Sequence, residues 1–308
     1  MTIASATHRR SFLKSGVALA ALAATGGLAG CNRETNADAP VPTLDEAPLA
    51  QTKYGPVRGA VEDGVQVFKG VRYGADTAAN RFGPPQPPLP WTEPQDALAY
   101  GASAPQPPSG DGGGLFASWR PNPPLPTSED CLFLNVWTPA VDTGARPVMV
   151  WFHGGGFTTG SGSSYAYDGT RLARRGDVVV VTVNHRLNLF GYLNLAHYGP
   201  RFADSPSAGV IDMIFALEWV RDNIAAFGGD PNNVLIFGES GGGAKVCTLM
   251  STDKAKRLFH RAAVQSGPRI AHPEAALAQK AADEVVKKLG LTRETIDQIL
   301  AKPVADIQ

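Results

Sequence analysis

The sequence has no net charge and little cysteine. In its 308 residues, 28 lysines and arginines balance 28 aspartates and glutamates. A chain with this balance has no general attraction for nucleic acid or for another strongly charged polymer. Its three cysteines and six histidines form no cluster with metal-ligand spacing. The sequence therefore predicts neither a metal site nor a bound cofactor.

The sequence also lacks an apolar run long enough to span a bilayer. Its most apolar N-terminal stretch, residues 16–28, is uncharged but has only about thirteen residues. Arg9-Arg-Ser-Phe-Leu-Lys14 precedes it and resembles a bacterial twin-arginine export signal. Leu28-Ala-Gly-Cys31 follows it and resembles a lipobox, in which Cys31 becomes the acylated first residue. The alternative is an ordinary signal with a chance cysteine.

This N-terminal segment predicts the organisation and the location of the protein. We expect residues 1–31 to be a twin-arginine-type signal peptide with a lipobox, and residues 32–50 to be a flexible, polar tether. Residues 51–308 would form the folded domain. Acyl chains on Cys31 would hold the exported protein at a membrane, in the periplasm or cell envelope. The sequence does not indicate an oligomeric state.

Strand and helix patterns alternate along the folded part. Continuous apolar runs are typical of strands that are covered on both faces. Such runs predict strands at 132–137, 147–152, 178–183, 234–237 and 262–265. Helices are predicted at 208–227, 241–250, 273–289 and 292–300. This alternation predicts an α/β fold with a largely parallel sheet.

Two glycine-rich motifs carry the chemistry. Gly238-Glu-Ser-Gly-Gly242 follows a predicted strand and opens a predicted helix, so the small residues let Ser240 stand on a sharp turn. His153-Gly-Gly-Gly-Phe157 follows another strand, and its glycines leave backbone N–H groups unshielded. Together they predict a nucleophilic serine beside an oxyanion hole. The alternative for the second motif is a plain glycine turn.

Longer stretches around these motifs resemble the type-B carboxylesterases, the cholinesterase-like branch of the α/β-hydrolases. The matching segments are 227–242, 129–139, 183–193 and 217–224. The resemblance runs from about residue 52 to residue 267. It implies an α/β-hydrolase fold, with a mostly parallel central sheet and helices on both faces, incomplete at the C-terminus.

The resemblance also implies roles for individual residues. Ser240 would be the nucleophile, and the N–H groups of Gly155, Gly156 and Gly241 would form the oxyanion hole. Glu239 would be a supporting carboxylate rather than the acid of the triad. The implied activity is a serine hydrolase that cleaves small-molecule carboxylic esters through an acyl-enzyme.

Further residues are interpreted from the same resemblance. Two pairs resemble ion pairs that fix loops: Arg81 with Glu129, and Arg186 with Asp212. The family often pairs a cysteine at position 131 with an upstream cysteine, which Ala104 replaces here, so we expect Cys131 and also Cys247 to be free thiols. Trp119 and Phe116 lie in a loop that carries a gorge-facing aromatic residue in cholinesterases, where a ring can hold a cation or an apolar group. The favoured alternative is packing of this loop.

We expect the acid and base of the triad to lie outside this sequence. In this fold they follow the serine in the order acid, then histidine. Only His260 and His272 follow Ser240, neither where such a base is expected, and His153 precedes it. We therefore expect the N-terminal part of a longer esterase, inactive alone. The alternative is a non-catalytic, cholinesterase-like binding or adhesion module, although such relatives typically lose the serine that is present here.

Overall fold

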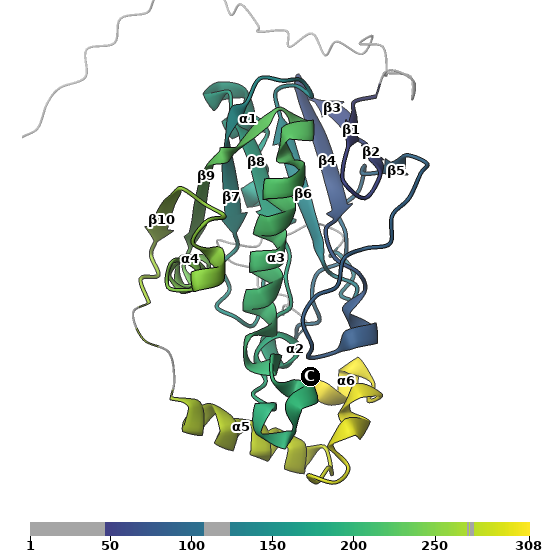
Figure 1. Cartoon of the computed structure of the whole chain (residues 1–308), viewed down its shortest axis with the longest axis vertical. Helices are drawn as coiled ribbons and strands as arrows, with labels where there is room; N and C mark the ends of the chain where they lie inside the picture. The colour runs from purple at the N-terminus through teal and green to yellow at the C-terminus, as the bar shows by residue number, and fades with distance from the viewer. Residues whose placement is uncertain (1–46, 108–123, 270, 272–273) are drawn as a thin grey trace, which may run out of the picture. The chain divides into compact units, whose positions relative to one another are not determined.

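A seven-stranded sheet forms the centre of the computed structural model, which describes residues 47–107, 124–269, 271 and 274–308 (Figure 1). The strand order is β10-β9-β7-β8-β6-β4-β3. In chain order these strands are β3 (Ala60–Glu62), β4 (Val65–Arg72), β6 (Phe133–Thr138), β7 (Arg146–Phe152), β8 (Val179–Val183), β9 (Gly229–Glu239) and β10 (Arg261–Gln265). A small separate sheet contains β1 (Leu49–Gln51), β2 (Pro56–Arg58) and β5 (Gln95–Asp96).

The middle of the large sheet is parallel. Strand β7 pairs in parallel with both β8 and β9, and β9 pairs in parallel with β10. Strand β6 is antiparallel to both β8 and β4, so β4 runs in the same direction as the parallel strands. The predicted α/β fold is confirmed, and all five predicted strands are present. Strand β9 begins five residues before the predicted strand, at Gly229, because that residue still pairs with Arg146 across a register shift.

The helices of the described residues are α1 (Thr170–Gly176), α2 (Asn188–Tyr192), α3 (Ala208–Asn223), α4 (Gly241–Met250), α5 (Ala275–Lys288) and α6 (Val304–Ile307). Three of the four predicted helices are present as α3, α4 and α5, whereas α1, α2 and α6 were not predicted. The predicted helix at 292–300 is instead a 3₁₀ helix, Ile296–Leu300. Its Ile299 carbonyl, like that of Lys302, accepts a hydrogen bond from the Arg81 guanidinium, at 2.9 and 2.7 Å. These two carbonyl groups therefore accept hydrogen bonds from a side chain, and not from the backbone N–H groups of a further helical turn.

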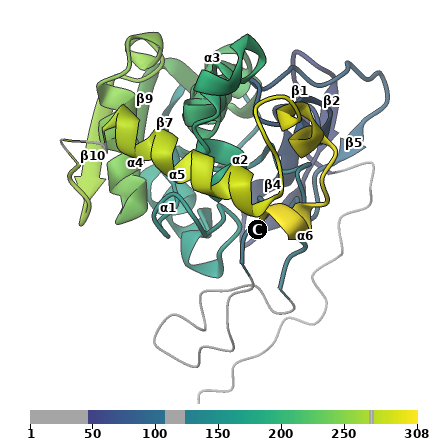
Figure 2. The same ribbon diagram turned by 90° about the horizontal axis from the view of Figure 1, so that it is seen from below.

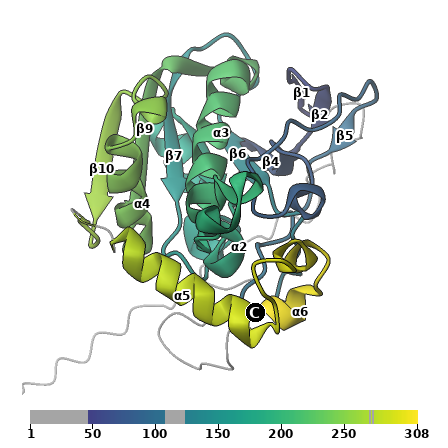
Figure 3. The same cartoon turned by 60° about the horizontal axis from the view of Figure 1, so that its bottom comes forward.

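Helices cover both faces of the sheet, as the resemblance implies. On one face, Val150 of β7 and Ile236 of β9 belong to the same core as Leu217 of α3. On the other face, Trp137 and Val180 pack with Ala173 of α1. Figure 3 shows α3 and α4 lying against the sheet. Packing on one face therefore holds α3 against the strands β7 and β9.

A second core lies at the end of the described chain. Helix α5 and the 3₁₀ helix Ile296–Leu300 place Val286 and Ile299 in a cluster with Phe82, Phe190 and Phe202. Figure 2 shows α5 passing from the side of α4 to the side of α2 and α6. This cluster ties the C-terminal residues to the loops around α2.

The N-terminal predictions fall mostly outside the described residues. The signal peptide, Cys31 and nearly all of the predicted tether lie within residues 1–46. The tether boundary at residue 50 is wrong, because Leu49 and Ala50 already pair in β1 and Ala50 is fully buried. Within the described residues, no helix has the length and apolar character needed to cross a membrane.

Candidate active site

Ser240 occupies a sharp turn between β9 and α4. Its backbone has φ 56° and ψ −120°, a conformation that costs a residue with a side chain about 1–3 kcal/mol. The Ser240 N–H donates to the Gln265 carbonyl of β10 at 2.9 Å, and the Ser240 carbonyl accepts from the Ala244 N–H at 3.1 Å. The turn is thus held from both sides while the residue stays exposed. This is the strand-to-helix placement that the motif predicts.

The outer glycines of the motif let β7 approach the turn. A Cβ atom at Gly238 would lie 2.6 Å from the Phe152 carbonyl oxygen, and one at Gly242 would collide with the same oxygen. Any larger residue at these positions would push the turn away from the end of β7. The backbone of the turn therefore packs against the backbone of β7. This strand leads into residues 153–157, which we call the glycine loop.

The three glycines assigned to the oxyanion hole lie together. Gly155 and Gly156 have φ of 87° and 64°, conformations that L-residues with side chains rarely adopt. A Cβ atom at Gly241 would collide with the Gly156 backbone, so the loop lies directly against the start of α4. A Cβ atom at Gly154 would lie 3.6 Å from the Ser240 Cβ. The backbone donors are therefore positioned beside the serine.

Glu239 lies next to this loop. A Cβ atom at Gly154 would be 3.4 Å from the Glu239 carboxylate oxygen Oε2. The pKa of Tyr167 is raised by burial, and the Glu239 charge also raises it, so the two side chains share one environment. This placement fits the interpretation of Glu239 as a supporting carboxylate.

The described histidines do not supply a base for Ser240. His153 is 1% exposed, and its ring stacks on that of His185 with centroids 5.0 Å apart. Burial, together with the Lys245 charge, lowers the pKa of His153 well below its usual value. The neutral ring then donates from Nδ1 to the Gly154 carbonyl oxygen, at 2.8 Å. His260 Nδ1 accepts from the Val234 N–H at 3.1 Å, and His272 lies outside the described residues.

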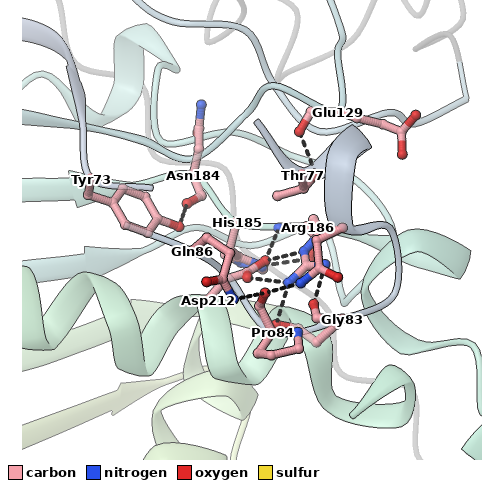
Figure 4. Close-up of polar contacts among 12 residues, drawn as sticks. Tyr73, Thr77, Gly83, Pro84, Gln86, Glu129, Asn184, His185, Arg186 and Asp212 are labelled. Carbon is pink, nitrogen blue, oxygen red and sulfur yellow. Dashed lines mark hydrogen bonds and ion pairs between the residues drawn. The ribbon is translucent and has the colours of Figure 1, made fainter. Parts of the chain in front are cut away.

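A buried ion pair fixes the segment that carries His185 (Figure 4). The Arg186 guanidinium donates to both Asp212 oxygens, at 2.8 and 2.6 Å, and also to the Gly83 carbonyl, at 2.8 Å. The two paired side chains are 2% and 0% exposed. The pair joins the chain after β8 to α3, as the sequence predicts, and it supports the His185 ring that stacks behind the glycine loop.

The remaining sequence predictions have mixed outcomes. The Arg81–Glu129 pair is present, with Arg81 Nε 2.7 Å from Glu129 Oε1. Cys131 and Cys247 are free, and burial raises the pKa of the Cys131 thiol well above its usual value. Trp119 and Phe116 lie in residues 108–123, outside the described residues.

Sequence reasoning missed two residues that hold the glycine loop. Lys245 donates from Nζ to the His153 carbonyl at 2.8 Å, and it is the one charged residue of α4, which was the available signal. Gln106 accepts from the Gly160 N–H at 2.8 Å and donates to the Gly160 carbonyl at 3.0 Å. The available signal for this glutamine was its place in Ala104-Pro-Gln106, which matches a C-P-Q stretch of the family that the sequence resembles.

Comparison with known proteins adds an independent observation. A family model described as "Carboxylesterase family" matches residues 46–307. The para-nitrobenzyl esterase of Bacillus subtilis (strain 168) is 41% identical over 261 residues, which cover 84% of this chain and 51% of that protein. The phenmedipham hydrolase of Pseudarthrobacter oxydans is 43% identical over 222 residues, which cover 72% of this chain and 43% of that protein.

Solved structures agree with these relatives. A thermophilic PNB esterase superimposes with a TM-score of 0.79 at 38% identity, covering 85% of this chain and 52% of the esterase. An esterase from anaerobic Clostridium hathewayi superimposes with a TM-score of 0.77 at 44% identity, covering 86% and 53%. The chain therefore spans about half the length of the proteins that it matches.

Proposed function

The chain belongs to the carboxylesterase family, and we propose on this basis that it supplies the nucleophile and oxyanion hole of an enzyme that hydrolyses carboxylic esters. The observation that carries the proposal is the strained Ser240 turn with Gly155, Gly156 and Gly241 packed beside it. A binding module would have no need to maintain a serine in a conformation that costs free energy.

The chemistry follows from this arrangement. A base removes the Ser240 hydroxyl proton while Oγ attacks the ester carbonyl carbon, and the carbonyl oxygen becomes an anion. The N–H groups of the three glycines donate to that anion, and this is where most of the rate gain is expected. The alcohol leaves with the proton from the base. Water, activated by the same base, then releases the acid and regenerates Ser240.

The substrates proposed for this site are small, neutral esters of carboxylic acids. The balanced charge of the chain favours no strongly charged polymer. Two relatives are named for the hydrolysis of small molecules, as a para-nitrobenzyl esterase and a phenmedipham hydrolase.

The test uses the complete natural protein that carries this sequence and p-nitrophenyl acetate. Ser240→Ala should lower kcat by about 10⁴-fold or more, because the nucleophile is lost while folding is retained. Ser251→Ala, at the opposite end of α4, is the matched control and should keep full activity. Wild-type protein without hydrolysis, or an active Ser240→Ala variant, would contradict the proposal.

We further propose that the protein is exported and anchored through a lipid on Cys31. The support is Arg9-Arg-Ser-Phe-Leu-Lys14 followed by Leu28-Ala-Gly-Cys31. Intact mass of the membrane fraction should give a product that begins at Cys31 and carries acyl chains, and Cys31→Ser should abolish acylation. A soluble mature protein that begins at another residue would overturn this proposal.

A further inference from the structure

Lys245 is a buried lysine beside the glycine loop. It lies in α4, five residues after Ser240, and its exposure is 0%. Within the described part of the chain, no carboxylate forms an ion pair with its ammonium group. Its hydrogen bond to the His153 carbonyl, at 2.8 Å, joins positions that are 92 residues apart.

Lys245 contacts both ends of the glycine loop. His153 is the residue before Gly154, and Phe157 is the residue after Gly156. The Lys245 Nζ binds the carbonyl of the first and lies 5.9 Å from the ring centroid of the second, within cation–π range. One side chain of α4, the helix that follows the nucleophile Ser240, therefore contacts the residues on both sides of the three glycines.

Other contacts also hold the loop on both sides of the three glycines. Glycines have no side chains to pack, so backbone contacts must hold them in place. At the far end, Thr159 N–H donates to the Gly155 carbonyl at 3.1 Å, and Gln106 holds Gly160. At the near end, Tyr167 forms a hydrogen bond with the Gly154 backbone and the His153 ring stacks on His185, and Lys245 adds a hydrogen bond that reaches the loop from α4.

Stability alone gives no reason for a lysine at this position. Removing an ammonium group from water is costly unless it is fully paired, and an apolar side chain of similar length avoids that cost. His153 and His185, whose pKa values the Lys245 charge lowers, are also basic, so neither offsets the lysine charge. A role in holding the loop accounts for the lysine where core packing does not.

We propose that Lys245 is a positioning residue that ties the glycine loop to the nucleophile helix and so keeps the Gly155 and Gly156 N–H groups beside Ser240. The inference rests on the proposed ester hydrolysis, because those N–H groups matter through the oxyanion that they stabilise. Lys245 itself does not contact the substrate. Its loss should therefore weaken binding of the transition state and leave binding of the ester largely unchanged.

The experiment compares three variants of the complete natural protein. Lys245→Met keeps the length but removes the donor, whereas Lys245→Gln keeps an N–H donor. Leu249→Met is the matched control, since Leu249 is equally buried on α4 and a leucine-to-methionine change conserves volume. With p-nitrophenyl acetate, Lys245→Met should lower kcat by about 10- to 100-fold and change KM by less than about threefold. A trifluoromethyl ketone inhibitor should lose affinity by a similar factor, and Lys245→Gln should recover part of both.

A second measurement is independent of activity. Backbone hydrogen exchange in a peptide that covers residues 153–157 should become faster in Lys245→Met and stay at the wild-type rate in Leu249→Met. The inference is overturned if Lys245→Met keeps wild-type kcat and inhibitor affinity, or if its exchange is unchanged. If the wild type shows no Ser240-dependent hydrolysis, the proposed function fails, and the exchange rates still decide whether Lys245 holds the loop.

Discussion

At the residue scale, the site depends on groups in unfavourable surroundings. Ser240 has a strained backbone, and Lys245 places an ammonium group in the core. Each costs free energy that the surrounding packing must offset, because the folded state is stable by only about 5–15 kcal/mol. Substitutions at the site should therefore change stability or catalysis measurably.

Burial of Lys245 should make stability depend on pH. Burial lowers the pKa of Lys245 from 10.5 to about 7 in the folded state. Between these values the unfolded chain binds more protons, so the free energy of unfolding rises with pH, by up to about 1.4 kcal/mol per unit. Stability therefore decreases as the pH falls from 10.5 towards 7, and below about 7 it no longer depends on this group, because both states then hold the proton. Urea unfolding at pH 7.5 to 9.5 should show a steeper rise in the wild type than in Lys245→Met; this range lies above the one in which the buried His153 and His185 also contribute.

The control for that slope is Lys280→Met, which removes an exposed lysine of α5. Its free energy of unfolding should follow the wild type across the whole pH range. Equal pH slopes for wild type and Lys245→Met would show that Lys245 stays protonated in the folded protein.

Gly155→Ala should impair catalysis more than folding. Its φ of 87° is one that alanine rarely adopts, and the added methyl group would collide with the Thr159 carbonyl and displace an assigned oxyanion donor. We expect kcat for p-nitrophenyl acetate to fall by about tenfold or more, since one lost donor costs about 10²–10³. Gly176→Ala, where an added Cβ meets only ordinary contacts at 3.4 Å, is the control. Full activity in Gly155→Ala would mean that the Gly155 N–H does not bind the oxyanion.

At the element scale, buried ion pairs hold the loops against the helices. Arg186 and Asp212 join the chain after β8 to α3, and Arg81 joins Glu129 to carbonyl groups near the C-terminus. A buried pair of this kind adds little net stability, but the loss of one partner leaves an uncompensated charge. The pairs therefore define how loops and helices fit together.

Asp212→Ala should destabilise the fold by about 3–5 kcal/mol, because it leaves the Arg186 guanidinium buried and unpaired. Asp96→Ala removes one partner of the more exposed Arg58–Asp96 pair and should cost less than about 1 kcal/mol. Urea unfolding of both variants measures the difference. Similar losses of unfolding free energy in the two variants would show that burial does not decide what it costs to break these ion pairs.

At the scale of the whole molecule, the parallel centre of the sheet places the site. Strands β7 and β9 are parallel neighbours, so the glycine loop and the serine turn that follow them meet at one edge. Ligand sites in α/β sheets lie at this carboxyl edge. The topology therefore brings two motifs together although they are far apart along the chain.

The 308-residue polypeptide by itself should show no Ser240-dependent hydrolysis of p-nitrophenyl acetate. Among the described residues, no histidine forms a hydrogen bond with Ser240, so its hydroxyl has no base to remove the proton. The measurement is the rate of wild-type polypeptide minus that of Ser240→Ala at equal concentration. A clear difference would show that a base is present after all, and His272, which is outside the described residues, would be the first to replace.

The sequence by itself determined the parts of this protein that depend on local chain chemistry. The Gly-Glu-Ser-Gly-Gly turn and the apolar runs identify the nucleophile, the strands and the fold class, because each requires particular residues next to one another. Only the tertiary structure showed that Lys245 reaches His153, that Gly241 touches Gly156 and that β9 begins at Gly229. These contacts join residues that are distant in sequence. Periodicity and composition describe neighbours along the chain, so they do not predict which distant backbone groups a side chain will contact in the folded protein.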